Sequence, residues 1–245
     1  MSVGCNMEVK KLKQQIRERI WRLLEEKDVA TFPKPVYGRI PNFKGAEHAT
    51  RRILDLKIWR DAEVVKSNPD SPQYFLREAA VRQGKQLLIA TPRLRSGFLM
   101  IKPNMIDYSK AFKVATIRGA FKYGKIVRLE EIPHVDLIVT GCVAVDSIGR
   151  RLGKGGGYSE LEYAILRELG VVNESTPIVT TIHDLQFVGQ VPLEPHDYTL
   201  DYASTPTRLV KFEGEKIRPR GVYWDLLGEK ENLEVIKELR RILRR

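Results

Sequence analysis

The sequence has few cysteines and no long apolar run. Its two cysteines are Cys5, near the start, and Cys142, inside an apolar segment. This sparse usage argues against a disulfide scaffold or a thiolate metal site. No apolar run approaches the roughly 18 residues of a membrane-spanning helix, and the first residues lack the apolar core of a secretory signal. We therefore expect a cytoplasmic protein without a membrane partner.

The composition is that of a folded globular chain. Of its 245 residues, 42% are hydrophobic and 30% are charged, which is enough apolar surface to offset the entropy of ordering. The length fits one domain or two small ones, and no shift in composition marks a boundary. We expect a single α/β domain over residues 1–245, with an N-terminal helix at 8–27 and a C-terminal helix at 231–244.

The formal net charge of +11 favours an anionic partner. A nucleotide, a polyanionic cofactor and a nucleic acid all fit this charge. Basic and acidic residues alternate along the helical segments, so solvated helix faces account for much of the excess. The sequence also lacks the aromatic, glycine-clamp and cysteine motifs of common nucleic-acid-binding modules. A nucleic-acid-binding protein is therefore an alternative that charge alone supports.

Apolar periodicity predicts alternating helices and strands. Helical spacing recurs at 8–27, with Lys13 and Arg17 four positions apart on one face. Further helices are expected at 46–58 and 73–82 and over SELEYAILRELG. Nearly continuous apolar runs are typical of buried parallel strands, and they occur at QLLIATP, VDLIVTGCVAV, TPIVTTIHD and TRLVKF. The pattern predicts a three-layer α/β/α, doubly wound, Rossmann-like fold with a mostly parallel sheet.

A glycine-rich segment, Gly153 to Gly157, lies between an apolar strand and a helix. Glycines let the backbone approach phosphate oxygens, and free N–H groups at a helix N-terminus stabilise negative charge. Lys154 and Arg151 would add positive charge. The segment matches neither GxxxxGK[ST] nor GxGxxG. A nucleotide phosphate site and a flexible turn are both consistent with it.

Carboxylates and histidines follow the later strands, where ligands gather in open α/β sheets. His183 and Asp184 end one apolar run, and His196 and Asp197 follow soon after. Asp197 could supply an oxygen ligand to magnesium. Caps of the surrounding turns are an equally good interpretation of these pairs.

Three segments together resemble the 5-formyltetrahydrofolate cyclo-ligase family. They are KQQIR at 13–17, RLGKGGGY at 151–158 and VPLEPHDYTLDYASTPTRLV at 191–210, and they occur in the family's order. The segments FPKPVYGRIPNFKGA, NPDSP and TPRL are closer to the subgroup of methenyltetrahydrofolate synthetase domain-containing proteins.

The resemblance implies an ATP- and magnesium-dependent enzyme of one-carbon metabolism. ATP would phosphorylate the formyl oxygen of 5-formyltetrahydrofolate, and a nitrogen would then close on the activated carbon to give 5,10-methenyltetrahydrofolate. Lys154 and Arg151 would stabilise the transferring phosphoryl group. The nucleotide would be bound by Lys13, Arg17, Arg151, Gly153, Lys154, Gly155, Gly156, Gly157 and Tyr158. Asp197 and Glu160 would hold magnesium, and Asp70 is the candidate for contact with the folate.

The sequence departs from the family where GYYD reads GYSE. Ser159 replaces a tyrosine, which removes an aromatic surface for a flat pterin. Glu160 replaces an aspartate and is one methylene longer, which matters in a tight octahedral site. A nucleotide-binding homologue with a different, non-folate substrate is therefore the alternative function.

Overall fold

The structure is a computed structural model that describes residues 3–244, with side chains from Met7 onward except that of Met105. The outermost residues of the predicted 1–245 domain and the side chain of Cys5 lie outside this part. Within the described part, no helix is both long and apolar enough to cross a membrane.

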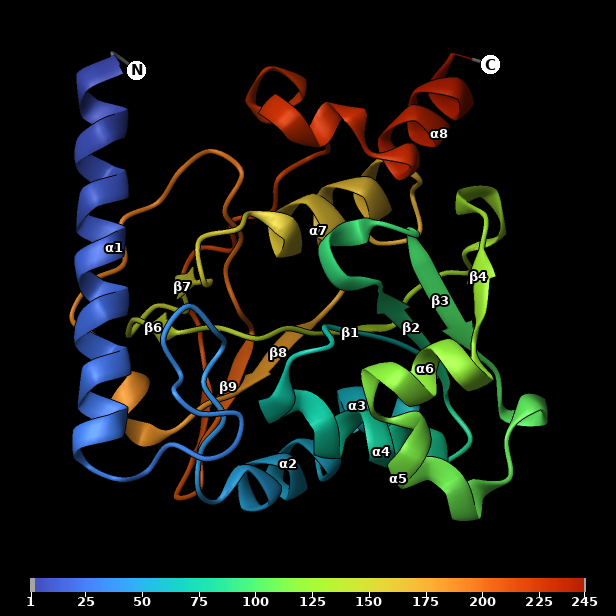
Figure 1. The fold of residues 1–245 in the computed structure, drawn as a ribbon, viewed down its shortest axis with the longest axis horizontal. Helices are drawn as coiled ribbons and strands as arrows, with labels where there is room; N and C mark the ends of the chain where they lie inside the picture. Colours follow the sequence, from blue (N-terminus) through green and yellow to red (C-terminus); the bar gives the residue numbers. More distant parts are fainter. Residues whose placement is uncertain (1–2, 245) are drawn as a thin grey trace.

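An eight-stranded mixed sheet forms the centre of the molecule (Figure 1), in the order β10-β9-β8-β5-β1-β2-β3-β4. The five strands from β9 to β2 are parallel, whereas β10 and the β3–β4 pair are antiparallel additions at the two edges. The strands are β1 (Val64–Ser67), β2 (Gln86–Ala90), β3 (Phe98–Ile101), β4 (Lys125–Val127), β5 (Leu137–Val139), β8 (Ile178–Thr181), β9 (Tyr202–Ser204) and β10 (Leu209–Lys211).

Helices cover both faces of this sheet. Alternate residues of a strand point to opposite faces, so Leu88 and Ala90 of β2 enter the core beneath α7 and α8, and Leu87 and Ile89 enter the core beneath α2 to α6. The helices are α2 (Ala46–Leu54), α3 (Lys57–Asp61), α4 (Tyr74–Arg82), α5 (Ala111–Val114), α6 (Ile117–Tyr123), α7 (Tyr158–Glu168) and α8 (Glu234–Leu243). The predicted three-layer α/β/α fold with a mostly parallel sheet is confirmed.

The first helix, α1 (Val3–Glu26), packs on a small ribbon instead of the main sheet. Its apolar face, which includes Ile16 and Ile20, contacts the two-stranded sheet of β6 (Ala144–Val145) and β7 (Arg151–Leu152). This ribbon leads directly into the glycine-rich segment. The packing therefore brings α1 alongside that segment.

Several predicted elements differ in detail. The run VDLIVTGCVAV was predicted as one strand but forms β5 and then β6, in different sheets, because the chain leaves the main sheet at the tightly packed Gly141. The helix predicted at 46–58 is interrupted by the extended Leu56. Near the C-terminus, Gly228–Asn232 forms the 3-10 helix η8, and α8 begins only at Glu234.

Four strands of the main sheet were not predicted, and β1 is the most informative of them. Its apolar run is broken by Lys66, which in the structure is 1% exposed and forms a buried ion pair with Glu162 of α7. A charged residue in a central strand hides the apolar pattern that sequence analysis depends on. Strands β3, β4 and β9 were missed as well.

Candidate functional site

The glycine-rich segment lies between β7 and the N-terminus of α7, on the side of the molecule where α1 runs (Figure 1). Gly155 and Gly157 have φ angles of +99° and +63°, which L side chains rarely adopt. Gly157 is also the N-cap of α7. Free N–H groups and the positive end of the helix dipole face this turn, so its geometry suits an anion.

Arg17 of α1 holds the turn. Its Nε donates a hydrogen bond of 2.8 Å to the carbonyl oxygen of Gly153, and a Cβ on Gly155 would lie 3.3 Å from its guanidinium carbon. Burial lowers the pKa of Arg17, and the nearby carboxylates of Glu160 and Asp197 oppose this effect. Arg17 was predicted at this site, and the structure places it there.

Lys13, one turn earlier on α1, contacts two acids. Its Nζ donates hydrogen bonds of 2.5 Å to Asp197 Oδ2 and 2.8 Å to Glu194 Oε2. The backbone N–H of Glu194 also donates to Asp197 Oδ2, at 2.7 Å. Lys13 is only 4% exposed. The structure thus brings the predicted residues Lys13 and Asp197 together, but as an ion pair.

Arg151 lies beneath the turn and is 2% exposed. It forms an ion pair with Glu160 in the first turn of α7, its guanidinium lies 4.6 Å from the ring centre of Tyr198, and it donates to the carbonyl oxygen of Gly141. Burial acts to raise the pKa of Glu160, but Arg151 and a backbone hydrogen bond together outweigh it, and the net pKa falls to about 2. Arg151 therefore supports the turn from below.

Lys154 is the exposed cation of the turn. Its Nζ lies 3.2 Å from Oδ1 of Asp70, in the segment that follows β1. The buried Arg77 fixes that segment, because its Nη1 donates to the carbonyl oxygens of Asn68 and Asp70 at 2.7 and 2.9 Å. The two predicted site residues Lys154 and Asp70 thus face each other across the site.

Ser159, where the family pattern has tyrosine, joins a hydroxyl cluster. Its Oγ lies 2.8 Å from the Tyr198 hydroxyl and 3.1 Å from Thr140 Oγ1, at the carboxyl end of β5. Burial raises the pKa of Tyr198 to about 12, although Arg151 opposes it. Tyr198 and Thr140 were not predicted, since isolated hydroxyl residues carry no sequence pattern.

The remaining predicted residues fall into two groups. Gly156 lies in the turn and Tyr158 directly follows it as the first residue of α7, and a Cβ on Gly156 would lie 3.1 Å from the Tyr158 ring. His183 is the N-cap of a short 3-10 helix, where its Nδ1 accepts a hydrogen bond from the N–H of Leu185, and Asp184 accepts from the hydroxyls of Thr205 and Thr207. The contacts of His183 and Asp184 therefore fit a structural role in the surrounding turn, which was one of the two interpretations of this pair.

The carboxylates proposed for magnesium are each paired with a cation. Asp197 binds Lys13, and Glu160 binds Arg151. Among the residues that the structure describes, no three His, Cys, Asp or Glu side chains gather as a metal site. Magnesium is often held by one or two carboxylates together with substrate phosphates. The donor set therefore fits magnesium as a companion of a nucleotide and does not form a metal cage of its own.

Lys230 of η8 also reaches this region and was not predicted. Its Nζ lies 5.2 Å from the ring centre of Tyr158. It belongs to a C-terminal segment whose sequence carries no motif, and only its packing on α7 brings it to the turn.

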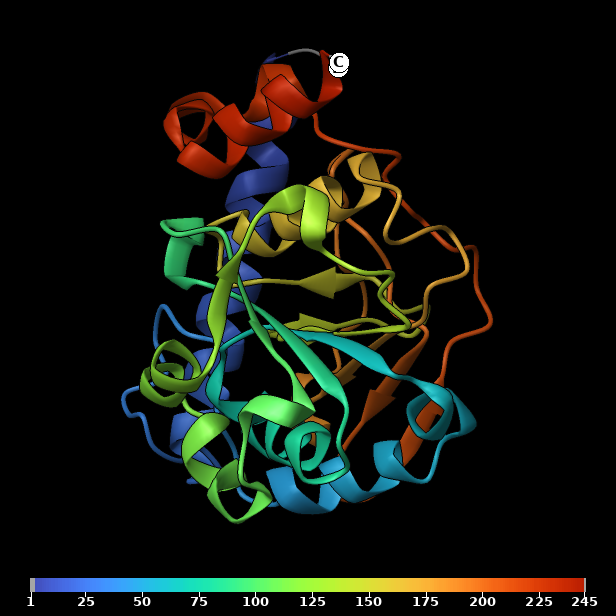
Figure 2. The same ribbon diagram turned by 90° about the vertical axis from the view of Figure 1, so that its right-hand side faces the viewer.

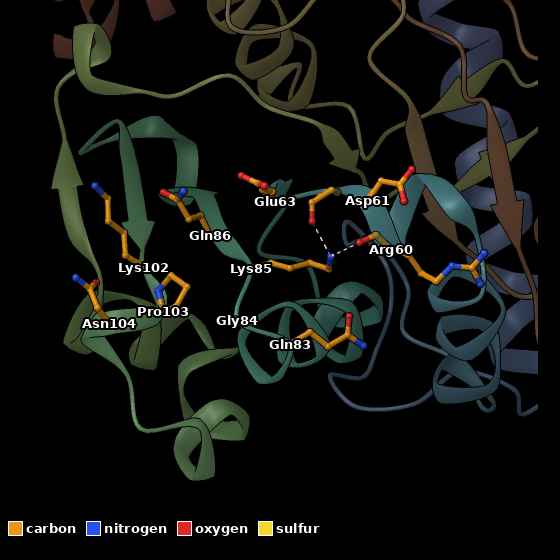
Figure 3. A pocket seen from close by; sticks show the side chains of 11 residues that line it. Arg60, Asp61, Glu63, Gln83, Gly84, Lys85, Gln86, Lys102, Pro103 and Asn104 are labelled. Carbon is orange, nitrogen blue, oxygen red and sulfur yellow. Dashed lines mark hydrogen bonds between the residues drawn. The ribbon is translucent and has the colours of Figure 1, made fainter.

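A separate open pocket of about 680 Å³ lies at the opposite end of the strands (Figure 3). Lys85 lines it and donates hydrogen bonds to the carbonyl oxygens of Arg60 and Ala62, at 3.2 and 2.6 Å. Glu63 precedes β1 and Gln86 begins β2, so the pocket is at the amino ends of these strands. Ligands of open α/β sheets gather at the carboxyl ends, where the glycine turn lies.

Comparison with known proteins gives a consistent result. The profile of the 5-formyltetrahydrofolate cyclo-ligase family matches residues 9–206. Two curated proteins named methenyltetrahydrofolate synthase domain-containing protein are similar over most of this chain. The one from Bos taurus is 40% identical over 237 residues (93% of this chain, 62% of that protein), and the one from Homo sapiens is 39% identical over 235 residues (93% and 61%). The chain thus spans about three fifths of the length of these relatives.

More distant similarities point to the same family. A 5-formyltetrahydrofolate cyclo-ligase of Mycolicibacterium smegmatis is 30% identical over 79 residues, which cover 32% of this chain and 38% of that protein. The solved structure of Aquifex aeolicus 5,10-methenyltetrahydrofolate synthetase superimposes with a TM-score of 0.53 at 18% identity, covering 83% of this chain and 94% of the other. At that identity the superposition supports the fold alone.

Proposed function

Because the chain belongs to the 5-formyltetrahydrofolate cyclo-ligase family, a family of ligase-type enzymes, we propose that it uses ATP to convert 5-formyltetrahydrofolate to 5,10-methenyltetrahydrofolate, with release of ADP and phosphate. The observation that carries the proposal is the turn Gly153–Gly157 at the N-terminus of α7, with Arg17 bonded to it and the exposed Lys154 within it.

The turn is suited to the phosphates of ATP. Its backbone N–H groups and the dipole of α7 stabilise negative charge, and the left-handed glycines allow close approach. Lys154 is the cation most accessible to a ligand, since its side chain is 46% exposed. Arg17 adds charge from α1, whereas Arg151 is buried and holds the turn in place through Glu160.

The chemistry requires positioning and charge more than a nucleophile. Phosphoryl transfer to the formyl oxygen is accelerated by aligned cations that stabilise the charge of the transferring group. We assign this role to Lys154 and, through its support of the turn, to Arg151. Magnesium would accompany the phosphates and neutralise part of their charge, with Asp197 and Glu160 as the proposed protein ligands.

The second substrate would enter beside Asp70, which faces Lys154 across the site. Ser159 provides a specific reason to keep a non-folate substrate as the alternative. Its hydroxyl is directed into the cluster with Tyr198 and Thr140, so this position offers no aromatic face to a pterin.

Calorimetric titration with ATP and magnesium, followed by addition of 5-formyltetrahydrofolate, tests the proposal. Methenyl product, followed by absorbance, should form in the wild type and be strongly reduced in Lys154→Met. The exposed Lys125 of β4 offers a matched control, and Lys125→Met should retain full activity. ATP binding without product would favour the non-folate alternative, and absence of ATP binding would refute both.

A further inference from the structure

Lys230 lies at the nucleotide turn although it follows the region that the family profile matches, which ends at residue 206. Its Nζ lies 5.2 Å from the ring centre of Tyr158, the first residue of α7. A Cβ built on Gly157 would lie 2.8 Å from the same Nζ. The ammonium group is therefore next to the cap of α7, where the anion-binding N–H groups are.

The packing of the C-terminal segment fixes Lys230 in this place. Both ribbon views show the segment lying over α7 (Figures 1 and 2). Leu227, which begins the turn into η8, is 7% exposed and belongs to the same core as α7. The N–H of Val222 donates to Glu168 at the other end of α7, at 2.9 Å. The position of Lys230 is thus fixed by the buried Leu227, three residues earlier, in a segment that packs along α7.

The charge of Lys230 is not balanced locally. Within residues 7–244, no carboxylate lies within ion-pairing distance of its Nζ, and Glu160, the acid that acts on it, is already paired with Arg151. A cation at a helix N-terminus is repelled by the positive end of the dipole. Burial lowers the pKa of Lys230, with Glu160 opposing. An anion bound at the turn would offset both the repulsion from the helix dipole and the unfavourable burial of the ammonium charge.

The turn is flanked by cations from both ends of the chain. Gly155 faces the guanidinium of Arg17, from α1, and Gly157 faces the ammonium of Lys230, from η8. We infer that Lys230 is an additional phosphate-binding residue, which contacts the phosphates of a nucleotide bound at the Gly153–Gly157 turn. This inference rests on the proposed function, because it assumes that the turn binds a nucleoside triphosphate.

Binding of ATP with magnesium to Lys230→Met tests the inference, since methionine keeps an apolar stem on Tyr158 but removes the charge. We expect the dissociation constant to rise roughly ten-fold, the effect of losing one charge-assisted hydrogen bond, and to recover largely in Lys230→Arg. Lys237 of α8 is the matched control. It is exposed and pairs with Glu234 at 2.6 Å, so Lys237→Met should bind ATP as the wild type does.

Amine acylation read by mass spectrometry gives a second readout that a structural role would not change. ATP should protect Lys230 from acylation and leave Lys237 unprotected. If Lys230→Met binds ATP within about two-fold of the wild type, or if ATP gives no protection, the inference is wrong and the proposed function stands. If the wild type does not bind ATP, the proposed function fails and the inference fails with it.

Discussion

Nζ of Lys13 lies 2.5 Å from Oδ2 of Asp197, a residue 184 positions further along the chain. One turn away on the same helix, Arg17 donates to the carbonyl oxygen of Gly153. These two contacts attach α1, which packs outside the main sheet, to both segments of the candidate site. The first helix is therefore part of the site.

Lys13→Met should destabilise the protein. The substitution leaves Asp197 and Glu194 with side chains 7% and 14% exposed and without their counter-charge. Removing one partner of a buried ion pair typically costs about 3–5 kcal/mol, and we expect about 3 kcal/mol in the free energy of unfolding, measured with urea. Lys11→Met, at an exposed position on α1, is the control. If Lys13→Met lowers the free energy of unfolding no more than the control does, the ion pairs of Lys13 contribute little to stability.

Glu160→Gln should make the stability of the protein less sensitive to low pH. The pKa of Glu160 is about 2, below its ordinary value of 4.5, so its ionised form stabilises the folded state above pH 4.5. This contribution, on the order of 3 kcal/mol, is lost as the pH falls from 4.5 toward 2. Urea unfolding measures the free energy of unfolding at pH 7 and at pH 3. Its decrease between these two pH values should be smaller in Glu160→Gln than in the wild type. Equal decreases in both proteins would contradict the assignment.

Gly155→Ala should impair both stability and ATP binding. Its φ of +99° strains any L side chain, and the new Cβ would lie 3.3 Å from the Arg17 guanidinium. We expect a cost of about 1–2 kcal/mol and roughly ten-fold weaker binding as Arg17 is displaced. Gly170, with φ of +69° and open space around it, provides the control: Gly170→Ala should lose similar stability and keep its ATP affinity. Thermal unfolding and calorimetry measure the two effects. Loss of affinity in both variants would indicate a general effect of unfolding.

Asp70→Asn should strengthen ATP binding. Lys154 must leave Asp70 in order to contact a phosphate, and this pair is partly exposed. Such pairs contribute about 0.2–1 kcal/mol, so we expect affinity to increase by roughly two- to five-fold. Asp61→Asn removes a surface pair with Lys57 at the other end of the sheet and should have no effect. Weaker binding in Asp70→Asn would mean that this carboxylate takes part in binding the nucleotide complex.

The sequence by itself determined the fold class and the position of the glycine-rich turn. The run at Gln86–Ala90 and the helix at Tyr158–Glu168 have local apolar patterns that persist in the structure, because each pattern matches the period of its element. The glycines of the turn could be recognised for a similar reason, since left-handed backbone favours that residue.

Only the tertiary structure decided which charges meet. The sequence shows Lys13, Asp197 and Lys230 as three charged residues among many, and their contacts depend on how α1 and η8 pack against the body of the protein. The same holds for β1, whose buried Lys66 is tolerated because Glu162 lies opposite it on α7. Pairing of buried charges is set by distance in space, which local sequence periodicity does not encode.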